Sequence, residues 1–503
     1  MTITIVKDAL ASVGINFFAY WKGVKDMKKK EKISHKRLCV LTASIVLGMS
    51  SMSVASAGEI ISSGGKEVFD VNIVDDTDAT REQIKNYIFF DGIIGKNPMT
   101  ISDDNKNGII KGIQYWADIL APNTTITHPA QFFVAGIAKE KNAYAGFYAF
   151  DKGSFTIQPY FEEYLQGLRD LKDVNILKFE TGADKKIYEN GQLVDNGAYG
   201  TIMLGQYMGA KREGSTDGWW MKGNAVLPDN EHAVDGIAML RHEVGHSLGI
   251  ISQVNVELDK DGKPVIDQDG TTVYYFPVRL GKNNTYADHV YDQNLNRSQP
   301  NQLIITSKEF ERRQAADPTL KPSDFFILDN NLDDKFKSDN PRSGNAYFIG
   351  DNVSKVLNGR TFDGVDGLPL RTWETNTDEK VVLDMGHFEL NSLMSHNEYR
   401  NMTIFNEVEL AALQDIGYNF DRRAHFGYSI YNDNLTFTNT NGYSARNNEG
   451  TDYIDQYSTI PFGVGLHIYG SNNNITQAAN VFTKGNGAVG IWVSGTDNKL
   501  TLA

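Results

Sequence analysis

Residues 242–249 read His-Glu-Val-Gly-His-Ser-Leu-Gly and hold two histidines four positions apart. On a helix, residues with this spacing lie on one face, so both imidazoles can reach a single metal ion. Val244 and Leu248 continue an apolar stripe that turns the opposite face toward a core. Glu243 stands beside the metal-binding face, where a carboxylate can accept a proton from water. The stretch predicts an amphipathic helix that presents zinc ligands on one side.

The chain around this stretch predicts alternating helices and strands. We expect the zinc-binding helix to open at Pro228-Asp229-Asn230, with Asp229 or Asn230 as N-cap, and to end at Gly249. Apolar spacing predicts another helix from Asn107 to Leu120, which Pro122 closes. A short helix around 80–89 is expected within an entry segment at 58–104, and strands are expected at 131–135, 143–150, 174–179 and 198–208.

A catalytic zinc site usually takes a third protein ligand and leaves one position for water. In the compact metzincin pattern that ligand follows Gly249 by three residues, but Ser252 occupies the position. In thermolysin-like enzymes the ligand is a Glu on a following helix, yet the sequence around Glu257 indicates strand and turn. The remaining candidates downstream are histidines, namely His289, His387, His396, His425 and His467.

His387 precedes a Ser-Leu-Met turn at 392–394, which is where a metzincin with a long spacer has its third zinc histidine. On these motifs the chain resembles a leishmanolysin-like metzincin, the branch in which an insertion separates the glycine from the third histidine. The resemblance implies that His242, His246 and His387 bind one catalytic Zn²⁺ and that Glu243 is the general base. It also implies that Met394 is the Met-turn residue, which packs beneath the metal-binding histidines.

The resemblance covers about 105–420. Residues 404–418 are similar to the helix that closes this domain in bacterial relatives, and 286–292 are similar to an aromatic and Asp-containing segment of the group. His289 is therefore expected to be a structural or cleft residue. His396 and Tyr399 follow the turn closely, and each is either an accessory group near the metal or an ordinary turn residue. The resemblance also implies an extended substrate along an edge strand, for which 198–208 is the candidate.

The N-terminus has the order of an export signal. Lys28-Lys29-Lys30 open a basic stretch, an apolar and Ser-rich run follows from Leu38 to Val54, and Ala55-Ser56-Ala57 end it. This order is typical of a bacterial secretory signal peptide, and the run is short for a membrane anchor. We expect cleavage after Ala57 and an extracellular or cell-surface location. Residues 1–26 are either an extended signal region or sequence upstream of the true start.

Composition supports an exported globular protein. Apolar residues make up 41% of the 503 residues, and the formal net charge is −14. Residues 1–57 hold nine basic and three acidic residues, so the remainder has 40 basic and 60 acidic residues and a charge of −20. Nucleic acid is excluded as a partner, because phosphate binding needs a positive surface. The single cysteine, Cys39, lies in the signal, which excludes a disulfide framework and a thiolate zinc site.

Two Asp-x-Asp-Gly units, at 259–262 and 267–270, raise the question of calcium. An EF-hand loop needs a longer ligand series that ends in Glu, and that series is missing. Hairpin turns between alternating strands are therefore favoured, and a structural Ca²⁺ is an unsupported alternative.

The C-terminal part contains an internal repeat. Residues 465–476 (GLHIYGSNNNIT) align without gaps to 490–501 (GIWVSGTDNKLT), a period of 25 residues. Alternating apolar residues with Gly and Asn at the corners are typical of one coil of a parallel β-solenoid. A solenoid after a signal peptide resembles an autotransporter passenger. The pattern is still running at Leu502-Ala503, so two alternatives stay open: the solenoid is very short, or the sequence is a fragment and a further C-terminal part associates with the outer membrane.

These observations predict an α+β metzincin-like catalytic domain, a twisted sheet plus a zinc-binding helix, followed by the start of a parallel β-solenoid. We expect a signal with N-terminal extension at 1–57, an entry or pro-like segment at 58–104, and the catalytic domain at 105–425. An insertion lies around 254–380, and a partial solenoid at 426–503. The expected function is a zinc endopeptidase acting on proteins or peptides. The alternative is a surface adhesin or interaction passenger with an accessory or inactive metzincin domain.

Overall fold

The computed structural model describes residues 58–74, 101–137, 144–146, 174–182, 187–189, 192–194, 199–205, 219–222, 234–251, 254–268, 270–276, 286–328, 345–375, 381–390, 392–395, 405–440, 442, 457–458, 462–483, 485 and 487–503. The export signal at 1–57 and the expected helix at 80–89 lie outside the described residues. Among the described residues, no helix combines the length and the apolar character needed to cross a membrane.

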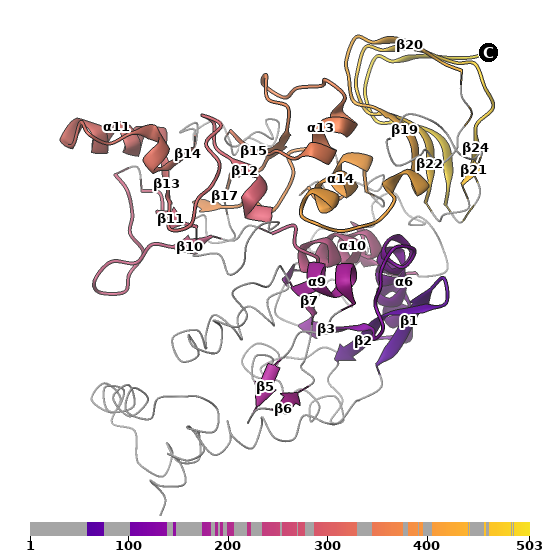
Figure 1. Ribbon diagram of the computed structural model, residues 1–503, viewed down its shortest axis with the longest axis horizontal. Coiled ribbons are helices and arrows are strands. Elements are labelled where there is room, and N and C mark those ends of the chain that lie inside the picture. Colours follow the sequence, from indigo (N-terminus) through magenta and orange to yellow (C-terminus); the bar gives the residue numbers. More distant parts are fainter. Residues whose placement is uncertain are drawn as a thin grey trace, which may run out of the picture.

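A five-stranded mixed sheet forms the base of the N-terminal part (Figure 1). The strands are β1 (Glu59–Ser63), β2 (Lys66–Val74), β3 (Ala130–Ile137), β7 (Gly200–Gly205) and β4 (Tyr144–Gly146), in that order across the sheet. Strands β2, β3 and β7 run parallel, while β1 and β4 pair antiparallel at the two edges. The expected strands at 131–135 and 198–208 correspond to β3 and β7, and β4 lies within the one expected at 143–150, whose other residues are outside the described ones.

Two findings correct the expectations for this sheet. The expected edge strand, 198–208, is β7 within the described residues, and β7 has β3 on one side and β4 on the other. Among the described strands, the outer position belongs to β4. The sheet also begins before the expected domain start at 105, because β2 pairs with β3 and β1 pairs with β2.

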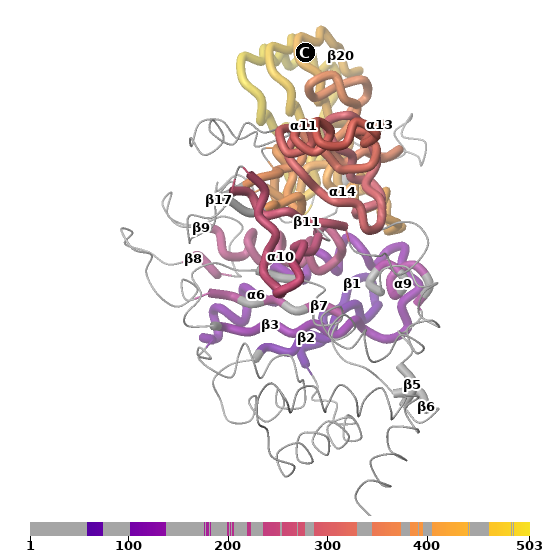
Figure 2. Tube along the Cα trace, turned by 90° about the vertical axis from the view of Figure 1, so that its left-hand side faces the viewer, coloured from indigo at the N-terminus to yellow at the C-terminus, as the bar shows by residue number. Residues whose placement is uncertain are grey.

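Helices α6 (Asp103–Leu120) and α10 (Gly236–Ser247) pack against each other above this sheet (Figure 2). Helix α6 is the one expected from Asn107, and it begins earlier because the Ser102 hydroxyl accepts the N–H of Asn105 at 3.3 Å. At its other end the Lys66 ammonium donates to the carbonyls of Ala121, at 2.9 Å, and Thr124, at 2.8 Å. This cation balances the negative end of the helix dipole.

Helix α10 starts later than expected. Val234 and Asp235 form strand β9, which pairs in parallel with β8 (Trp219–Trp220), so no helix runs through them from 228–230. The Asp235 carboxylate accepts the N–H of Ala238 at 2.9 Å and is the N-cap. Gly249 ends the helix as expected, with a φ of 119° that a residue with a side chain rarely adopts.

The expected strand at 174–179 is wrong, because these residues form helix α9 (Val174–Thr181). Ile176 and Phe179 are both buried and lie three positions apart, on one face of this helix. The N–H of Gly182 donates to the carbonyl of Lys178 at 3.0 Å, and its φ of 68° terminates the helix. A further hairpin, β5 (Ile187–Glu189) with β6 (Gln192–Val194), follows.

The described part of the region 254–380 carries small sheets and two α-helices. The strands β10 (Asn255–Val256), β11 (Tyr274–Tyr275), β13 (Leu303–Thr306) and β14 (Phe326–Leu328) form one sheet, and β12 (Val290–Tyr291), β15 (Ala346–Phe348) and β16 (Leu368–Leu370) form another. Helices α11 (Ser307–Ala316) and α13 (Asp351–Leu357) accompany them. The hairpin β17 (Trp373–Thr375) with β18 (Val381–Leu383) then returns the chain toward α10.

The two Asp-Gly units are hairpin turns, as expected. Antiparallel bridges join Leu258 to Pro264 and Ile266 to Thr272 across them. The Asp259 carboxylate accepts the backbone N–H of Asp261, at 2.8 Å, and Lys263, at 2.9 Å. The Asp259 carboxylate of the first turn therefore accepts hydrogen bonds from the backbone of its own turn.

The C-terminal part consists of helix α14 (Glu407–Asp415) and parallel strand ladders. Strands β19 (Phe426–Ile430), β22 (Val464–Ile468) and β25 (Val489–Val493) form one ladder, and β20 (Thr436–Asn439), β23 (Asn474–Gln477) and β26 (Lys499–Leu502) form another. A third pairs β21 (Tyr457–Ser458) with β24 (Phe482–Thr483). The pairing of β22 with β25 and of β23 with β26 joins the residues that the 25-residue repeat aligns.

The ladders pack on the helices that precede them. Both views place them at one end of the molecule, with α6 and α10 between them and β3 (Figures 1 and 2). Phe426, Tyr431, Phe462 and Val464 belong to the same buried cluster as the core of α10. The backbone N–H of Val408, at the start of α14, donates to the Tyr431 hydroxyl at 3.2 Å. A cut at 425 would therefore remove part of the shared core.

Candidate metal centre

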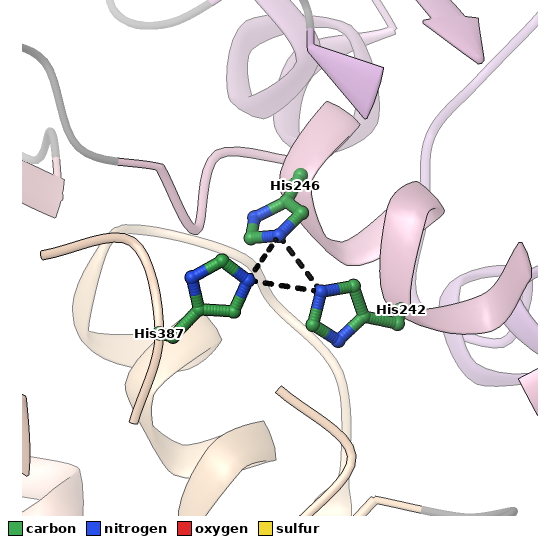
Figure 3. A group of neighbouring side chains, drawn as sticks. All are labelled: His242, His246 and His387. Atoms are coloured by element: carbon green, nitrogen blue, oxygen red, sulfur yellow. Dashed lines mark hydrogen bonds between the residues drawn. The ribbon is translucent and has the colours of Figure 1, made fainter. Parts of the chain in front are cut away.

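Three histidines from two distant segments meet at one point (Figure 3). His242 and His246 project from α10, and His387 projects from the loop after β18. The Nε2 atoms of His242 and His246 are 2.9 Å apart, and each is 3.1 Å from Nε2 of His387. Among the described residues this is the one group of three or more His, Cys, Asp or Glu that could hold a metal ion.

The hydrogen bonds of the three Nδ1 atoms determine which nitrogen of each histidine ring carries the proton. Nδ1 of His242 lies 2.6 Å from the Leu393 carbonyl, Nδ1 of His246 lies 2.5 Å from the Ile250 carbonyl, and Nδ1 of His387 lies 2.6 Å from Oδ2 of Asp384. A carbonyl or carboxylate oxygen only accepts, so each Nδ1 carries the proton and donates it. Each neutral ring then directs the Nε2 lone pair toward the other two.

This donor set fits a metal cation. Three inward lone pairs repel one another unless a positive charge lies between them. Two ligands about 2.05 Å from a tetrahedral ion are separated by about 3.3 Å, which is close to the observed 2.9–3.1 Å. Neutral imidazoles with their second nitrogen bonded to oxygen are the usual zinc ligands, and three of them leave one position for water.

The inserted region holds the loop that carries the third histidine. The Asp384 N–H donates to the Thr372 carbonyl at 2.6 Å, and the Arg371 N–H donates to the His387 carbonyl at 3.0 Å. The Tyr286 hydroxyl donates to the Met385 carbonyl at 2.9 Å. The long spacer between Gly249 and His387 thus supplies the partners that place the third imidazole.

Met394 lies under the helix that bears the first two histidines. It is fully buried, and a Cβ added at Gly245 would come 2.6 Å from its Sδ. Glycine at this position of α10 therefore lets the methionine approach the helix backbone between the two histidines. The Met394 carbonyl also accepts the N–H of Phe388 at 2.9 Å, which ties the turn to the His387 loop.

Glu243 is 4% exposed and lies on the same turn of α10 as His242. Its carboxyl group is thus largely shielded from bulk water beside the histidine cluster. The accessory candidates His396 and Tyr399 lie outside the described residues.

The three histidines of the cluster, His242, His246 and His387, are those expected from the sequence.

The other described histidines downstream have packing roles. His289 donates from Nδ1 to the Ile349 carbonyl at 3.0 Å and stacks on Phe348, as a structural residue would. Burial lowers the pKa of His425 to about 4. It lowers the pKa of His467, which stacks on Trp492, to about 3. Both rings therefore remain neutral inside the fold near neutral pH.

Sequence reasoning missed two carboxyl groups near the site. Asp384 orients His387, and its position three residues before a ligand histidine was an available signal. Glu409 on α14 is fully buried and holds the turn that contains Met394. Burial raises the pKa of Glu409 to about 7, although hydrogen bonds from Asn406 and the turn act in the other direction. No local pattern links this residue to a turn 15 positions away.

Comparisons with protein-family models, with curated proteins and with solved structures found no match for this chain. The function is therefore argued from the geometry of the site.

Proposed function

We propose that the protein is a zinc-dependent endopeptidase of the metzincin type, similar to leishmanolysin. The convergence of three Nε2 atoms, each with its Nδ1–H committed to an oxygen, carries this proposal. His242, His246 and His387 would hold the zinc ion. When bound, zinc acts as a Lewis acid and lowers the pKa of water toward neutrality.

The chain supplies the proton transfers and the substrate surface. Glu243 accepts a proton from the attacking water and delivers it to the leaving amine. Its burial keeps this carboxylate away from competing solvent. Among the described strands, β4 occupies the outer position of the sheet that supports α10, and no described strand pairs with its other edge, whose backbone groups can bond an extended peptide. We place the substrate there.

The C-terminal ladders support a second part of the proposal. Parallel strands that stack in register are the arrangement that the coils of a β-solenoid require, and the partners here are 38 residues apart in the first step (464 minus 426) and 25 in the second (489 minus 464). We propose that 426–503 is the start of such a solenoid, as in an autotransporter passenger. The N-terminal pattern at 1–57 supports export to the cell surface or the medium.

The test compares wild-type chain with Glu243→Gln on a proteome-derived peptide library. The full chain is used because residues beyond 425 belong to the shared core. We expect one zinc ion in both proteins and a loss of activity of about 10²–10⁴-fold in the variant. Glu311→Gln, an exposed change on α11, is the matched control and leaves activity unchanged.

Retained activity in Glu243→Gln with zinc bound would sink the proposed mechanism. A zinc-loaded wild type that cleaves no peptide would favour the adhesin alternative instead.

A further inference from the structure

The carboxyl group of Glu409 connects helix α14 to the turn at 392–394. Its side chain is fully buried. Oε1 accepts the backbone N–H of Met394 at 2.6 Å, and Oε2 accepts the N–H of Asn406 at 2.7 Å. One buried side chain thus joins the start of α14 to the turn.

The contact with Met394 acts on one peptide plane. The Met394 N–H and the Leu393 C=O belong to the same peptide group, which is planar and points these two atoms in opposite directions. Glu409 holds the N–H side of this plane. The Leu393 carbonyl, on the other side, accepts the Nδ1–H of His242 at 2.6 Å. Rotation of the plane would remove the acceptor that fixes the tautomer of His242.

We propose that Glu409 is a positioning residue of the metal centre, which orients His242 through the peptide plane between Leu393 and Met394. The proposal rests on the proposed function, since it takes His242 as a ligand. Glu409 touches neither the metal-binding nitrogens nor the substrate. It keeps the turn in the conformation that leaves the Nε2 lone pair of His242 directed at the ion.

A simple helix cap is the competing role. Asn406 and Glu409 form a capping box at the start of α14, and this box needs only the contact with Asn406. The contact with Met394, 15 residues away, adds nothing to the cap. A glutamine at 409 would keep the size of the side chain but would have one oxygen in place of two. Only one of the two N–H groups, of Met394 or of Asn406, could then donate to that oxygen. The other N–H would face the NH₂ group of the glutamine, which is itself a donor.

Glu407→Gln provides a matched control. Glu407 lies on the same first turn of α14, is 1% exposed, and accepts from Nε of Arg422 at 3.3 Å. The two variants remove one buried carboxylate each from the same helix. Only Glu409 contacts the turn.

The experiment measures zinc affinity of the full chain by chelator competition and records the visible spectrum of the Co²⁺-substituted protein. We expect Glu409→Gln to raise the Kd for zinc about 10–100-fold and to alter the Co²⁺ bands, as loss of an outer ligand partner does. Glu407→Gln should stay within about twofold of wild type. An unchanged Kd in Glu409→Gln, or equal losses in both variants, would show that Glu409 only caps the helix.

A second measurement covers the case in which Glu409→Gln does not fold. In zinc-free wild type with ¹⁵N-labelled histidine, we expect the NMR shifts of His242 to report a proton on Nδ1. A proton on Nε2 would overturn the proposal, because the carbonyl would then not be positioned without metal. Failure of the wild type to bind zinc would contradict the proposed function. The tautomer of His242 is measured without zinc, so it tests the role of the turn independently of that outcome.

Discussion

Replacement of Asp384 by asparagine tests how the third ligand is held. Oδ2 of Asp384 accepts the Nδ1–H of His387 at 2.6 Å, and Oδ1 accepts the N–H of Gly386 at 3.0 Å. The amide offers one oxygen for these two donors. If the oxygen stays on Gly386, the amide NH₂ faces Nδ1, and His387 relieves the clash by moving its proton to Nε2. That tautomer has no lone pair for the metal.

The expected effect follows from this geometry. Loss of a carboxylate behind a ligand histidine weakens metal binding about 10–100-fold, which is about 1.4–2.7 kcal/mol. Chelator competition near neutral pH measures the change in the Kd for zinc. Asp421→Asn is the control. Asp421 accepts the backbone N–H of Arg423 at 3.0 Å, just as Asp384 accepts that of Gly386, but it is not bonded to a histidine of the cluster. A folded Asp384→Asn variant with wild-type zinc affinity would refute the reasoning.

Three further predictions concern packing and stability. Gly245→Val places a branched side chain against Met394, where even a Cβ would lie 2.6 Å from Sδ, so we expect a loss of about 1–3 kcal/mol in unfolding free energy and weaker zinc binding. An unchanged melting temperature and zinc Kd would contradict this. Lys66→Met removes three bonds to the carbonyls of Ala121, Pro122 and Thr124 at the end of α6, and thermal melts should show a loss of about 1–2 kcal/mol; a loss below about 0.3 kcal/mol would count against it. His467 has a pKa of about 3 when folded, and an exposed imidazole has one near 6.5, so the unfolded chain binds more protons between these values. Stability attributable to His467 therefore falls as pH falls from about 6.5 toward 3, by up to about 1.4 kcal/mol per pH unit. The pH dependence of the melting temperature should be flatter in His467→Phe, and parallel curves would exclude this role.

The parts of the site that could be predicted are those encoded by local spacing. The histidines of α10 follow helical periodicity, and His387 is marked by the Ser-Leu-Met turn that follows it. The 25-residue repeat likewise predicted which residues pair between β22 and β25. These signals depend on neighbours in sequence, so they can be read without the fold.

The remaining features depend on contacts that are distant in sequence. Residues 174–179 are a short apolar run, and such a run does not distinguish a strand from a buried helix. The start of α10 was misplaced because strand β9 forms only through its pairing with β8. The outer position of β4 is likewise a property of the assembled sheet. Glu409 was missed for the same reason, since its partner turn is brought to it by the packing of α14.

X-ray absorption at the zinc edge of the purified full chain measures the ligands of the ion. We expect three imidazole nitrogens and one oxygen, each about 2.0–2.2 Å from the ion, and no sulfur. The His387→Ala variant should lose one imidazole contribution. A wild-type spectrum with two or fewer imidazoles, or one unaffected by His387→Ala, would contradict a site built from His242, His246 and His387.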